Sequence, residues 1–269
     1  DQYNSMKAID IPVLSTKEQG DDLLARELQF DAKGKCKFKI ILTTPEKVVR
    51  NHKFKLLLHE LYKDGHLERF VIDEAHCLSK WGNDFRKDYL ELKLLRKEFR
   101  TVPILALTAT APQEVREDVI EKLGFNNGLF FKQSYNRPNL KIIINHKKDK
   151  DAFIEIRDIV KNKFGDKSGI IYCLTKDNCE ELTKKLKSVK INCAFYHAGM
   201  EDYARTQVQN DWKNDEIQII VATCAFGMGI NKNDVRFVIH QSLPSSYENY
   251  YQEIGRAGRD GDEADCVLY

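Results

Sequence analysis

Two adjacent carboxylates, Asp73 and Glu74, follow the apolar run Phe-Val-Ile at 70–72, and His76 stands two residues later. At the end of a strand, one carboxylate can hold hydrated Mg²⁺ while the other orients an attacking water, as a metal–nucleotide site requires. The alternative is an acidic turn that caps a helix. For an isolated Asp-Glu pair we favour that alternative by roughly four to one, and the preceding apolar strand shifts the balance toward chemistry.

Two arginines, Arg256 and Arg259, stand three residues apart in the glycine-containing segment 251–261, which also holds Gln252. At this spacing they share one face of a helical turn. Their planar donor forks suit the charge that builds on a transferring phosphoryl group. A solvated basic helix end is the alternative.

Two further segments follow apolar runs and are rich in small residues. Thr108 and Thr110 lie in Leu-Thr-Ala-Thr-Ala at 107–111. Their hydroxyl groups can form bridging hydrogen bonds on the nucleotide side of a cleft, and a tight turn with an N-cap threonine is the alternative. The glycines of 221–231 permit close approach of a phosphate backbone or a nucleotide. A packed loop between strand and helix is the alternative there.

Short apolar runs alternate with amphipathic runs along the chain, which predicts a parallel α/β fold. In the first half we predict strands at 38–43, 69–73 and 103–107, and helices at 52–63, after Arg86 and at 112–123. The composition of these strands is that of strands covered on both faces. Parallel sheets bind ligands at the carboxyl ends of their strands, so the segments described above are where a site is expected.

The alternation breaks in the stretch 133–150 and then resumes, which places a domain boundary there. We predict a first domain at 1–134 and a second at 135–269. In the second we predict strands at 142–144, 169–173, 217–221 and 236–240, and helices at 151–164, 176–189, 201–214 and 246–256.

The charge and the cysteine content limit the classes of binding partner and metal site that the chain can have. The 43 Lys and Arg nearly balance the 41 Asp and Glu, so a nucleic-acid partner needs a local concentration of positive charge. The Lys-rich runs at 147–150 and 184–187 are better explained as solvated faces than as DNA grooves. The seven cysteines form no Cys-x-x-Cys pair, which favours free thiols and no zinc within this segment. No apolar run reaches about 18 residues, so we expect no membrane partner.

The order of these segments resembles that of the superfamily-two helicases. Further runs resemble the RecQ family of DNA helicases, with its eukaryotic Bloom-type members nearest. They are the aromatic-rich loop at 76–86, Asn-Arg-Pro-Asn-Leu at 136–140, Tyr-His-Ala-Gly-Met at 196–200, Phe-Gly-Met-Gly-Ile at 226–230 and Gln-Glu-Ile-Gly-Arg-Ala-Gly-Arg-Asp-Gly at 252–261. The likeness covers the whole chain and implies an α/β protein of two tandem RecA-like lobes with mainly parallel sheets.

The resemblance implies ATP and Mg²⁺ as cofactors. Asp73 would hold Mg²⁺, Glu74 would position the hydrolytic water, and His76 would relay between the nucleotide and the aromatic-rich loop. Arg256 and Arg259 would reach the γ-phosphate, with Arg259 as the arginine finger. The implied catalytic residues also include Gln252, and the implied nucleotide contacts are Asp73, Glu74, Gly229, Asn231, Arg256 and Arg259.

The DNA contacts that the resemblance implies are Thr44, Pro45, Trp81, Phe85, Arg86, His197 and Thr223. Trp81 and Phe85 can stack on bases, and Arg86 can pair with phosphate. A half-buried core aromatic is the alternative for Trp81. Asn83 departs from the histidine that is usual in the family, which affects the expected coupling between DNA binding and hydrolysis.

The phosphate-binding pattern Gly-x-x-x-x-Gly-Lys-Ser/Thr does not occur in the sequence, since the only Gly-Lys pair, Gly34-Lys35, is followed by Cys36. In relatives this loop lies before the segment where this chain begins, and the chain starts at Asp1 rather than Met. We therefore expect a motor-core fragment whose first lobe is incomplete at its N-terminus. The zinc-binding module of the family would lie beyond its C-terminal end.

The implied function is an ATP-dependent 3′–5′ DNA helicase that acts on single-stranded and partly duplex DNA in repair, recombination and replication. Repair proteins and topoisomerases would be partners, and the location would be the nucleus, or the cytoplasm in a prokaryote. The alternative is a catalytically inert DNA- or protein-binding fragment or paralogue. An RNA helicase is weaker, because the loop around Trp81 and the segment 252–261 do not fit that class.

Overall fold

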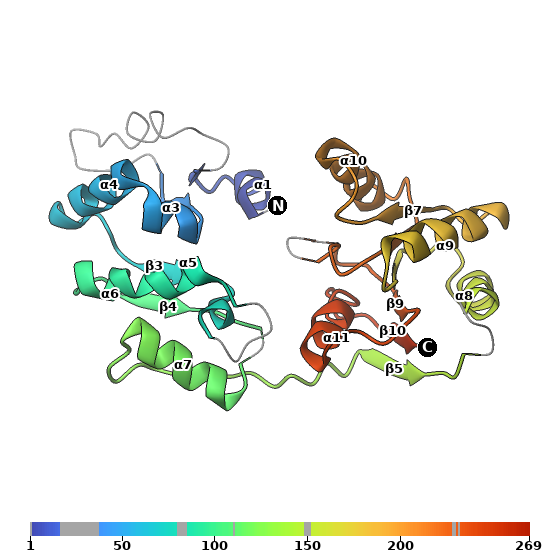
Figure 1. Cartoon of the computed structure of the whole chain (residues 1–269). Coiled ribbons are helices and arrows are strands. Elements are labelled where there is room, and N and C mark those ends of the chain that lie inside the picture. The colour runs from blue at the N-terminus through green and yellow to red at the C-terminus, as the bar shows by residue number, and fades with distance from the viewer. Residues whose placement is uncertain are drawn as a thin grey trace. The chain divides into compact units, whose positions relative to one another are not determined.

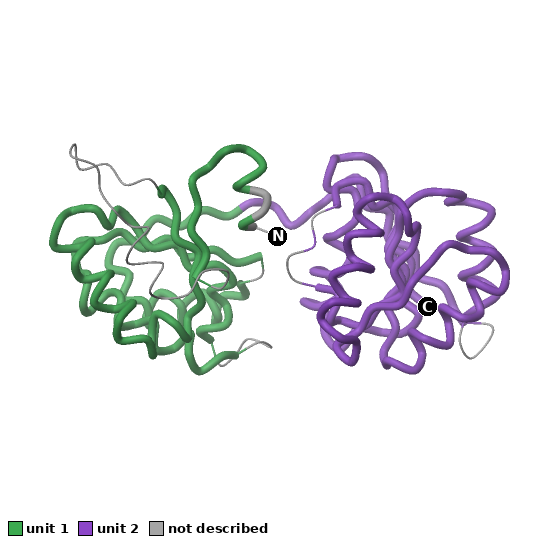
Figure 2. The backbone as a smooth tube through the Cα atoms, turned by 90° about the horizontal axis from the view of Figure 1, so that it is seen from above, with its two compact units in different colours: residues 1–132 green, residues 133–269 purple. Residues whose placement is uncertain are grey.

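The computed structural model describes residues 2–16, 38–79, 85–109, 111–147, 152–227, 230 and 232–269. The chain divides into two compact units, Asp1–Lys132 (unit 1) and Gln133–Tyr269 (unit 2), coloured separately in Figure 2. The division falls within the stretch where the strand–helix alternation breaks. No helix in the described ranges is long and apolar enough to cross a membrane.

Unit 1 contains short strands and helices with parallel pairing (Figure 1). Its elements are α1 (Gln2–Ala8), β1 (Val13–Ser15), β2 (Ile40–Leu42), α3 (Pro45–Arg50), α4 (His52–Lys63), β3 (Phe70–Ile72), the 3₁₀ helix η1 (Ala75–Leu78), α5 (Lys87–Leu90), η2 (Glu91–Lys93), α6 (Leu94–Glu98), β4 (Ile104–Ala106) and α7 (Gln113–Leu123). Strand β1 pairs with β2, and β3 pairs with β4. Helix α7 ends at Gly124, whose left-handed backbone is usual for this position.

The core of unit 1 covers only one face of the β3–β4 pair. Phe99 packs against the rings of Tyr62 and Phe70 within that core. Val71 and Leu105 are register partners on the opposite face and are 54% and 44% exposed. The expectation that these strands are covered on both faces is therefore wrong for this pair. The described helices of unit 1 bury the alternate residues, such as Ile72, instead.

Unit 2 contains a six-stranded sheet in which every pair is parallel, in the order β5-β10-β9-β6-β8-β7. Its elements are β5 (Leu140–Ile144), α8 (Phe153–Ile159), the π-helical turn η3 (Val160–Phe164), β6 (Gly169–Tyr172), α9 (Lys176–Ser188), β7 (Cys193–Tyr196), α10 (Asp202–Lys213), β8 (Ile219–Ala222), β9 (Phe237–His240), α11 (Tyr247–Ile254) and β10 (Ala264–Leu268). This confirms the prediction of tandem α/β lobes with parallel sheets.

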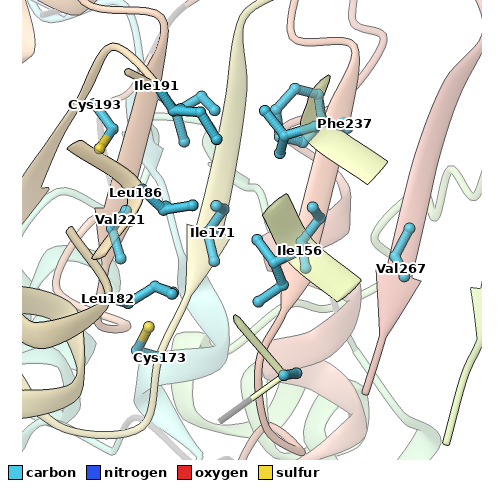
Figure 3. Close-up of a cluster of buried hydrophobic side chains, with 14 of the residues drawn as sticks. Ile156, Ile171, Cys173, Leu182, Leu186, Ile191, Cys193, Val221, Phe237 and Val267 are labelled. Carbon is cyan, nitrogen blue, oxygen red and sulfur yellow. The ribbon is translucent and has the colours of Figure 1, made fainter. Parts of the chain in front are cut away.

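Helices bury both faces of the inner strands of the unit 2 sheet, whereas Ile142 and Ile144 on the edge strand β5 are exposed. On one face, Ile156 of α8 and Leu182 and Leu186 of α9 pack against Ile171 and Val221 of the central strands (Figure 3). The other face packs against α10 and α11, which contribute Trp212 and Ile254. Successive residues of one strand join opposite clusters, as the two-residue side-chain period of a strand requires.

Several elements differ from the sequence-based prediction. The helix expected after Arg86 is divided into α5, η2 and α6, and the helix expected at 151–164 changes into the π-helical η3 at Val160. Elements α1, β1, α3, η1, β7 and β10 were not predicted. Strand β7, Cys-Ala-Phe-Tyr, has no β-branched residue, and α3 is only six residues long, so neither carries a strong periodic pattern.

Candidate nucleotide and nucleic-acid sites

Asp73 and Glu74 form a tight turn directly after β3. The backbone N–H of Glu74 donates to Asp73 Oδ1 at 2.9 Å, while the Asp73 side chain is exposed. Glu74 adopts a left-handed backbone conformation, with φ of 50°. A non-glycine residue in this conformation carries strain of about 1–3 kcal/mol, which the surrounding structure must offset. The turn thus fixes the direction in which the two carboxylates leave the end of the strand.

His76 links this turn to the segment that follows β4. The side chain is buried, and Nδ1 lies 2.9 Å from Thr108 Oγ1 and 3.3 Å from Glu74 Oε2. A backbone hydrogen bond from Ala75 N to Leu107 O, 2.8 Å long, joins the same two segments. The structure therefore brings the Asp-Glu-Ala-His turn together with Leu107 and Thr108, which lie more than 30 residues away in the sequence, while Thr110 lies outside the described residues.

Tyr89 belongs to this cluster, although the sequence patterns place it only on the apolar face of a helix. Its hydroxyl donates to the backbone oxygen of Asp73 at 3.3 Å. Burial, followed by the nearby thiol of Cys77 and the carboxylates of Asp73 and Glu74, raises the pKa of Tyr89 to about 12. The phenol therefore stays protonated and remains a donor to the carboxylate turn across the neutral range.

The donor groups of this turn suit Mg²⁺. Carboxylate oxygens are hard ligands, and Mg²⁺ is usually held by one or two carboxylates together with substrate phosphates and water. The described part of the chain contains no group of three or more His, Cys, Asp or Glu side chains that could form an all-protein metal cage. Asp73, exposed at the carboxyl end of β3, matches the mode of binding in which the nucleotide supplies the remaining ligands.

The two predicted arginines of unit 2 follow α11 and differ in exposure, since Arg256 is buried and Arg259 is exposed. Arg256 is 8% exposed and forms a side-chain hydrogen bond with the phenol of Tyr172. The Tyr172 hydroxyl donates to the backbone oxygen of Phe226 at 2.8 Å. Gln252, half-buried, lies in the last turn of α11, one helical turn before Arg256.

Arg259 contacts the loop after β8. Its Nη1 donates to Ile230 O at 2.7 Å. Burial, followed by the positive charges of Arg256 and Arg137, lowers the pKa of Arg259, and the guanidinium nevertheless stays charged. Three clustered guanidinium groups create a positive region that favours an anion such as a phosphate chain. Gly229 and Asn231, the other predicted nucleotide contacts, lie outside the described residues.

The predicted DNA contacts of unit 1 lie on the surface. Thr44 is the N-cap of α3, where its hydroxyl accepts from Lys47 N at 3.4 Å, and Pro45 is the first helical residue. Phe85 is half-buried and Arg86 is exposed, and the backbone N–H of Arg86 donates to Cys77 O. Trp81 and Asn83 lie outside the described residues.

The predicted DNA contacts of unit 2 follow β7 and β8 at the carboxyl edge of the sheet. His197 is 5% exposed, and its Nδ1 accepts from Gly199 N at 3.2 Å. Nε2 must then carry the proton and donate to Glu180 Oε1 at 3.1 Å. Thr223 is also buried, and its hydroxyl accepts from Ala225 N. Both side chains therefore shape the loops, and the exposed Ala198 and Gly199 form the surface beside them.

Family models and curated proteins match this chain along most of its length. A model described as DEAD/DEAH box helicase matches residues 2–119, and one described as helicase conserved C-terminal domain matches 151–261. The "ATP-dependent helicase SGS1" of Saccharomyces cerevisiae is 49% identical over 86% of this chain and 16% of its own length. The "ATP-dependent DNA helicase Q-like 4B" of Arabidopsis thaliana is 50% identical over 90% of this chain and 21% of its own. The "RecQ-like DNA helicase BLM" of Xenopus laevis is 42% identical over 100% of this chain and 20% of its own. The chain thus spans about a fifth of these relatives.

Solved structures share the fold at low sequence identity. A Saccharomyces cerevisiae Dbp5 structure, bound to RNA and ADP BeF3, has a TM-score of 0.67 and 19% identity, over 96% of this chain and 63% of that chain. The Mycobacterium smegmatis helicase Lhr, bound to single-stranded DNA and AMP-PNP, has a TM-score of 0.63 and 20% identity, over 96% of this chain and 34% of that chain. These likenesses show the fold, two RecA-like domains.

Proposed function

We propose, because this chain belongs to the RecQ family of helicases, that it forms the motor core of an ATP-dependent DNA helicase that moves 3′ to 5′. The observation that carries the proposal is the cluster of Arg256 and Arg259 beside Arg137, a half-buried positive region that suits a phosphate chain. The carboxylate turn of unit 1 supplies the complementary chemistry for a metal-bound nucleotide.

In this proposal the residues of unit 1 activate the nucleotide. Asp73 holds Mg²⁺, which when bound offsets the negative charge of the phosphates. Glu74 orients the attacking water, and its strained backbone keeps the carboxylate in one direction. The contact from His76 to Thr108 couples the conformation of this turn to that of the segment after β4. Arg256 and Arg259 stabilise the charge on the transferring phosphoryl group, with Arg259 as the arginine finger.

We further propose that single-stranded and partly duplex DNA binds over surface residues of both units. In unit 1 these are the exposed Thr44 and Arg86 and the half-buried Pro45 and Phe85, and the family resemblance adds Trp81. Unit 2 contributes the loops that His197 and Thr223 shape, at the carboxyl edge of the sheet. Small and polar loop residues there can approach the phosphate backbone closely, while an aromatic side chain can stack on a base.

A strand-separation assay on the native protein tests the helicase activity and its direction. The substrates are two duplexes of one sequence, with a single-stranded tail at either the 3′ or the 5′ end. We expect ATP-dependent separation of the 3′-tailed duplex alone, and its loss in the Glu74→Gln variant. Separation of only the 5′-tailed duplex would contradict the direction. No separation of either duplex would contradict the helicase activity.

The second candidate is a catalytically inert DNA- or protein-binding chain. The observation that favours it is the sequence itself, in which Gly34-Lys35 is followed by Cys36 and no Gly-x-x-x-x-Gly-Lys-Ser/Thr pattern occurs. We expect no meaningful ATP hydrolysis from these 269 residues alone, with or without single-stranded DNA. Robust turnover by the purified 269-residue chain would overturn that expectation.

The cellular role also follows only from likeness to the Bloom-type members. We propose action in DNA repair, recombination and replication, a nuclear location in a eukaryotic source, and repair proteins and topoisomerases as partners. A zinc-binding module beyond Tyr269 belongs to the same proposal. Microscopy of the tagged native protein, before and after induced strand breaks, tests the location and the role through enrichment at the damaged sites.

A further inference from the structure

The segment Tyr135–Asn139 lies against the turn that carries Arg256 and Arg259, although about 120 residues separate them in the sequence. Arg137 makes the central contacts. Its Nη1 donates to Gly255 O at 3.2 Å, and its Nη2 donates to Ala257 O at 3.0 Å and to Gly258 O at 2.7 Å. One planar guanidinium group thus donates hydrogen bonds to three carbonyl groups just after α11.

Two neighbours of Arg137 extend this contact on either side. Asn139 Nδ2 donates to Gly258 O at 2.8 Å and to Asp262 O at 2.9 Å. The Tyr251 hydroxyl on α11 donates to Tyr135 O at 2.6 Å, and the two tyrosine rings meet edge to face. The segment therefore holds the turn from Gly255 to Asp262 at both ends.

Two of the three bound carbonyl groups belong to the peptide units that join the preceding glycine to Arg256 and to Arg259. The carbonyls of Gly255 and Gly258 precede Arg256 and Arg259 directly along the chain, and that of Ala257 follows Arg256. The last carbonyls of a helix have no partner within it and form the negative end of its dipole, so a guanidinium group satisfies them well. Small rotations of these peptide units would redirect both arginine side chains.

The fit around Gly258 leaves no room for a side chain at this position. Gly258 has a left-handed backbone, with φ of 55°. A Cβ atom there would lie 2.5 Å from Asn139 Nδ2 and 2.6 Å from Asp262 O. The approach of Asn139 therefore depends on a glycine immediately before Arg259, which ties the segment to the position of that arginine.

We propose that Arg137 and Asn139 are positioning residues that hold Arg256 and Arg259 in the orientation needed on the transferring phosphoryl group. This inference rests on the proposed ATPase function. Arg137 acts through the backbone, because the hydrogen bonds of its two terminal nitrogens go to the turn. Its charge also adds to the positive region around Arg259.

Amide hydrogen exchange of the 269-residue chain tests the structural half of the inference. The variants are Arg137→Ala, Arg137→Lys and Asn139→Ala, with Arg157→Ala as the control, since Arg157 pairs with its neighbour Asp158 on α8, away from the turn. The readouts are the amides of Ala257 and Gly258, which donate to Ile254 O and Val235 O. We expect about tenfold or faster exchange in Arg137→Ala, a smaller rise in Arg137→Lys and Asn139→Ala, and none in the control.

DNA-stimulated ATP hydrolysis by the native protein tests the catalytic half. In Arg137→Ala we expect kcat to fall about tenfold or more while KM for ATP changes less than about threefold, because misorientation acts on the transition state. Arg137→Lys should restore part of kcat. In an Arg259→Ala background, Arg137→Ala should lower kcat by a smaller factor than in wild type, because only its effect through Arg256 remains.

The outcomes separate the inference from the proposed function. If amide exchange at Ala257 and Gly258 is unchanged in Arg137→Ala, the inference that Arg137 holds this turn in place is overturned. Raised exchange with unchanged kcat, or effects that add fully with Arg259→Ala, overturns the positioning role. A wild-type native protein without DNA-stimulated hydrolysis contradicts the proposed function and with it the catalytic half. In that case the exchange measurement alone decides whether Arg137 and Asn139 hold the turn in place.

Discussion

Unit 1 and unit 2 have related parallel folds but bury their sheets differently. In unit 2 the strands β6, β8 and β9 are buried along their whole length between two side-chain clusters. In unit 1 the β3–β4 pair packs against a single cluster, and Val71 and Leu105 face solvent. Parallel sheets are normally covered on both faces. The comparison indicates that the inner strands of unit 2 are covered on both faces, while the β3–β4 pair of unit 1 exposes an apolar face that a stable α/β domain would cover.

The candidate sites of the two units also differ in how their side chains are held. The carboxylate turn of unit 1 is exposed at Asp73, and its contacts come from His76, from Tyr89 and from the segment after β4. The arginine turn of unit 2 is held by the carbonyl contacts of Arg137 and by Asn139. Unit 2 should therefore keep its site geometry without help, whereas the geometry of unit 1 should depend on what covers its sheet.

The largest expected difference concerns the isolated units. A chain of residues 133–269 should unfold cooperatively in urea, with a free energy of unfolding of about 5 kcal/mol or more. A chain of residues 2–132 should be several kcal/mol less stable and should bind an apolar dye, because its sheet face is exposed. Circular dichroism and dye fluorescence measure both. Equally cooperative unfolding of the two chains, with equal free energies of unfolding, would contradict the proposed difference in stability between the units.

Matched truncations in the two sheets come next. Ile171→Ala in β6 removes a fully buried side chain and should lower the free energy of unfolding of unit 2 by about 2–5 kcal/mol. Val71→Ala in β3 removes an exposed side chain and should change that of unit 1 by less than about 1 kcal/mol. Urea titrations of the single variants give both values. A large loss from Val71→Ala would show that its face is covered.

Two glycines with left-handed backbones give a smaller, sharper contrast. Gly65 in unit 1 has φ of 73° and open space where the methyl group of an alanine would lie, so Gly65→Ala should cost about 1 kcal/mol. An alanine in place of Gly258 in unit 2 would collide with Asn139 and Asp262, so Gly258→Ala should cost about 3 kcal/mol. Thermal melts of the two variants check the order. Equal shifts would mean that Asn139 moves aside without loss.

The smallest expected effect is a pH dependence confined to unit 2. A hydrogen bond from Lys232, whose side chain is buried, lowers the pKa of Asp215 from its ordinary value of 3.8. The unfolded state therefore takes up the proton first, so this stabilisation is present above about pH 4–5 and is lost as the pH falls through the lowered pKa. Asp215→Asn should flatten this acid dependence of unit 2 stability. An unchanged slope in urea titrations between pH 6 and about 3 would contradict the assignment.

The sequence predicted the central strands better than the contacts around them. Strand β8 and helix α4 carry strong apolar patterns, so they were located closely. The side-chain contacts of Arg137 were missed because its partners lie 118 to 121 residues away and leave no local pattern. The burial of His197 was missed for the same reason, since Glu180 lies on a different element.

The exposed face of unit 1 could not be predicted either. Apolar composition shows that Val71 and Leu105 favour burial, but it does not show whether another element reaches them. The role of Tyr89 was hidden in a similar way, because a tyrosine at an apolar helix position looks like a core residue until its hydroxyl is found against Asp73.

The most direct test of the account is steady-state ATP hydrolysis by the native protein, with and without single-stranded DNA, in wild type and in Arg259→Ala. We expect DNA-stimulated hydrolysis in wild type. In Arg259→Ala we expect kcat to fall about a hundredfold or more, with ATP affinity nearly unchanged, because an arginine finger acts mainly on the transition state. DNA-stimulated hydrolysis that is equally fast in Arg259→Ala would contradict the account.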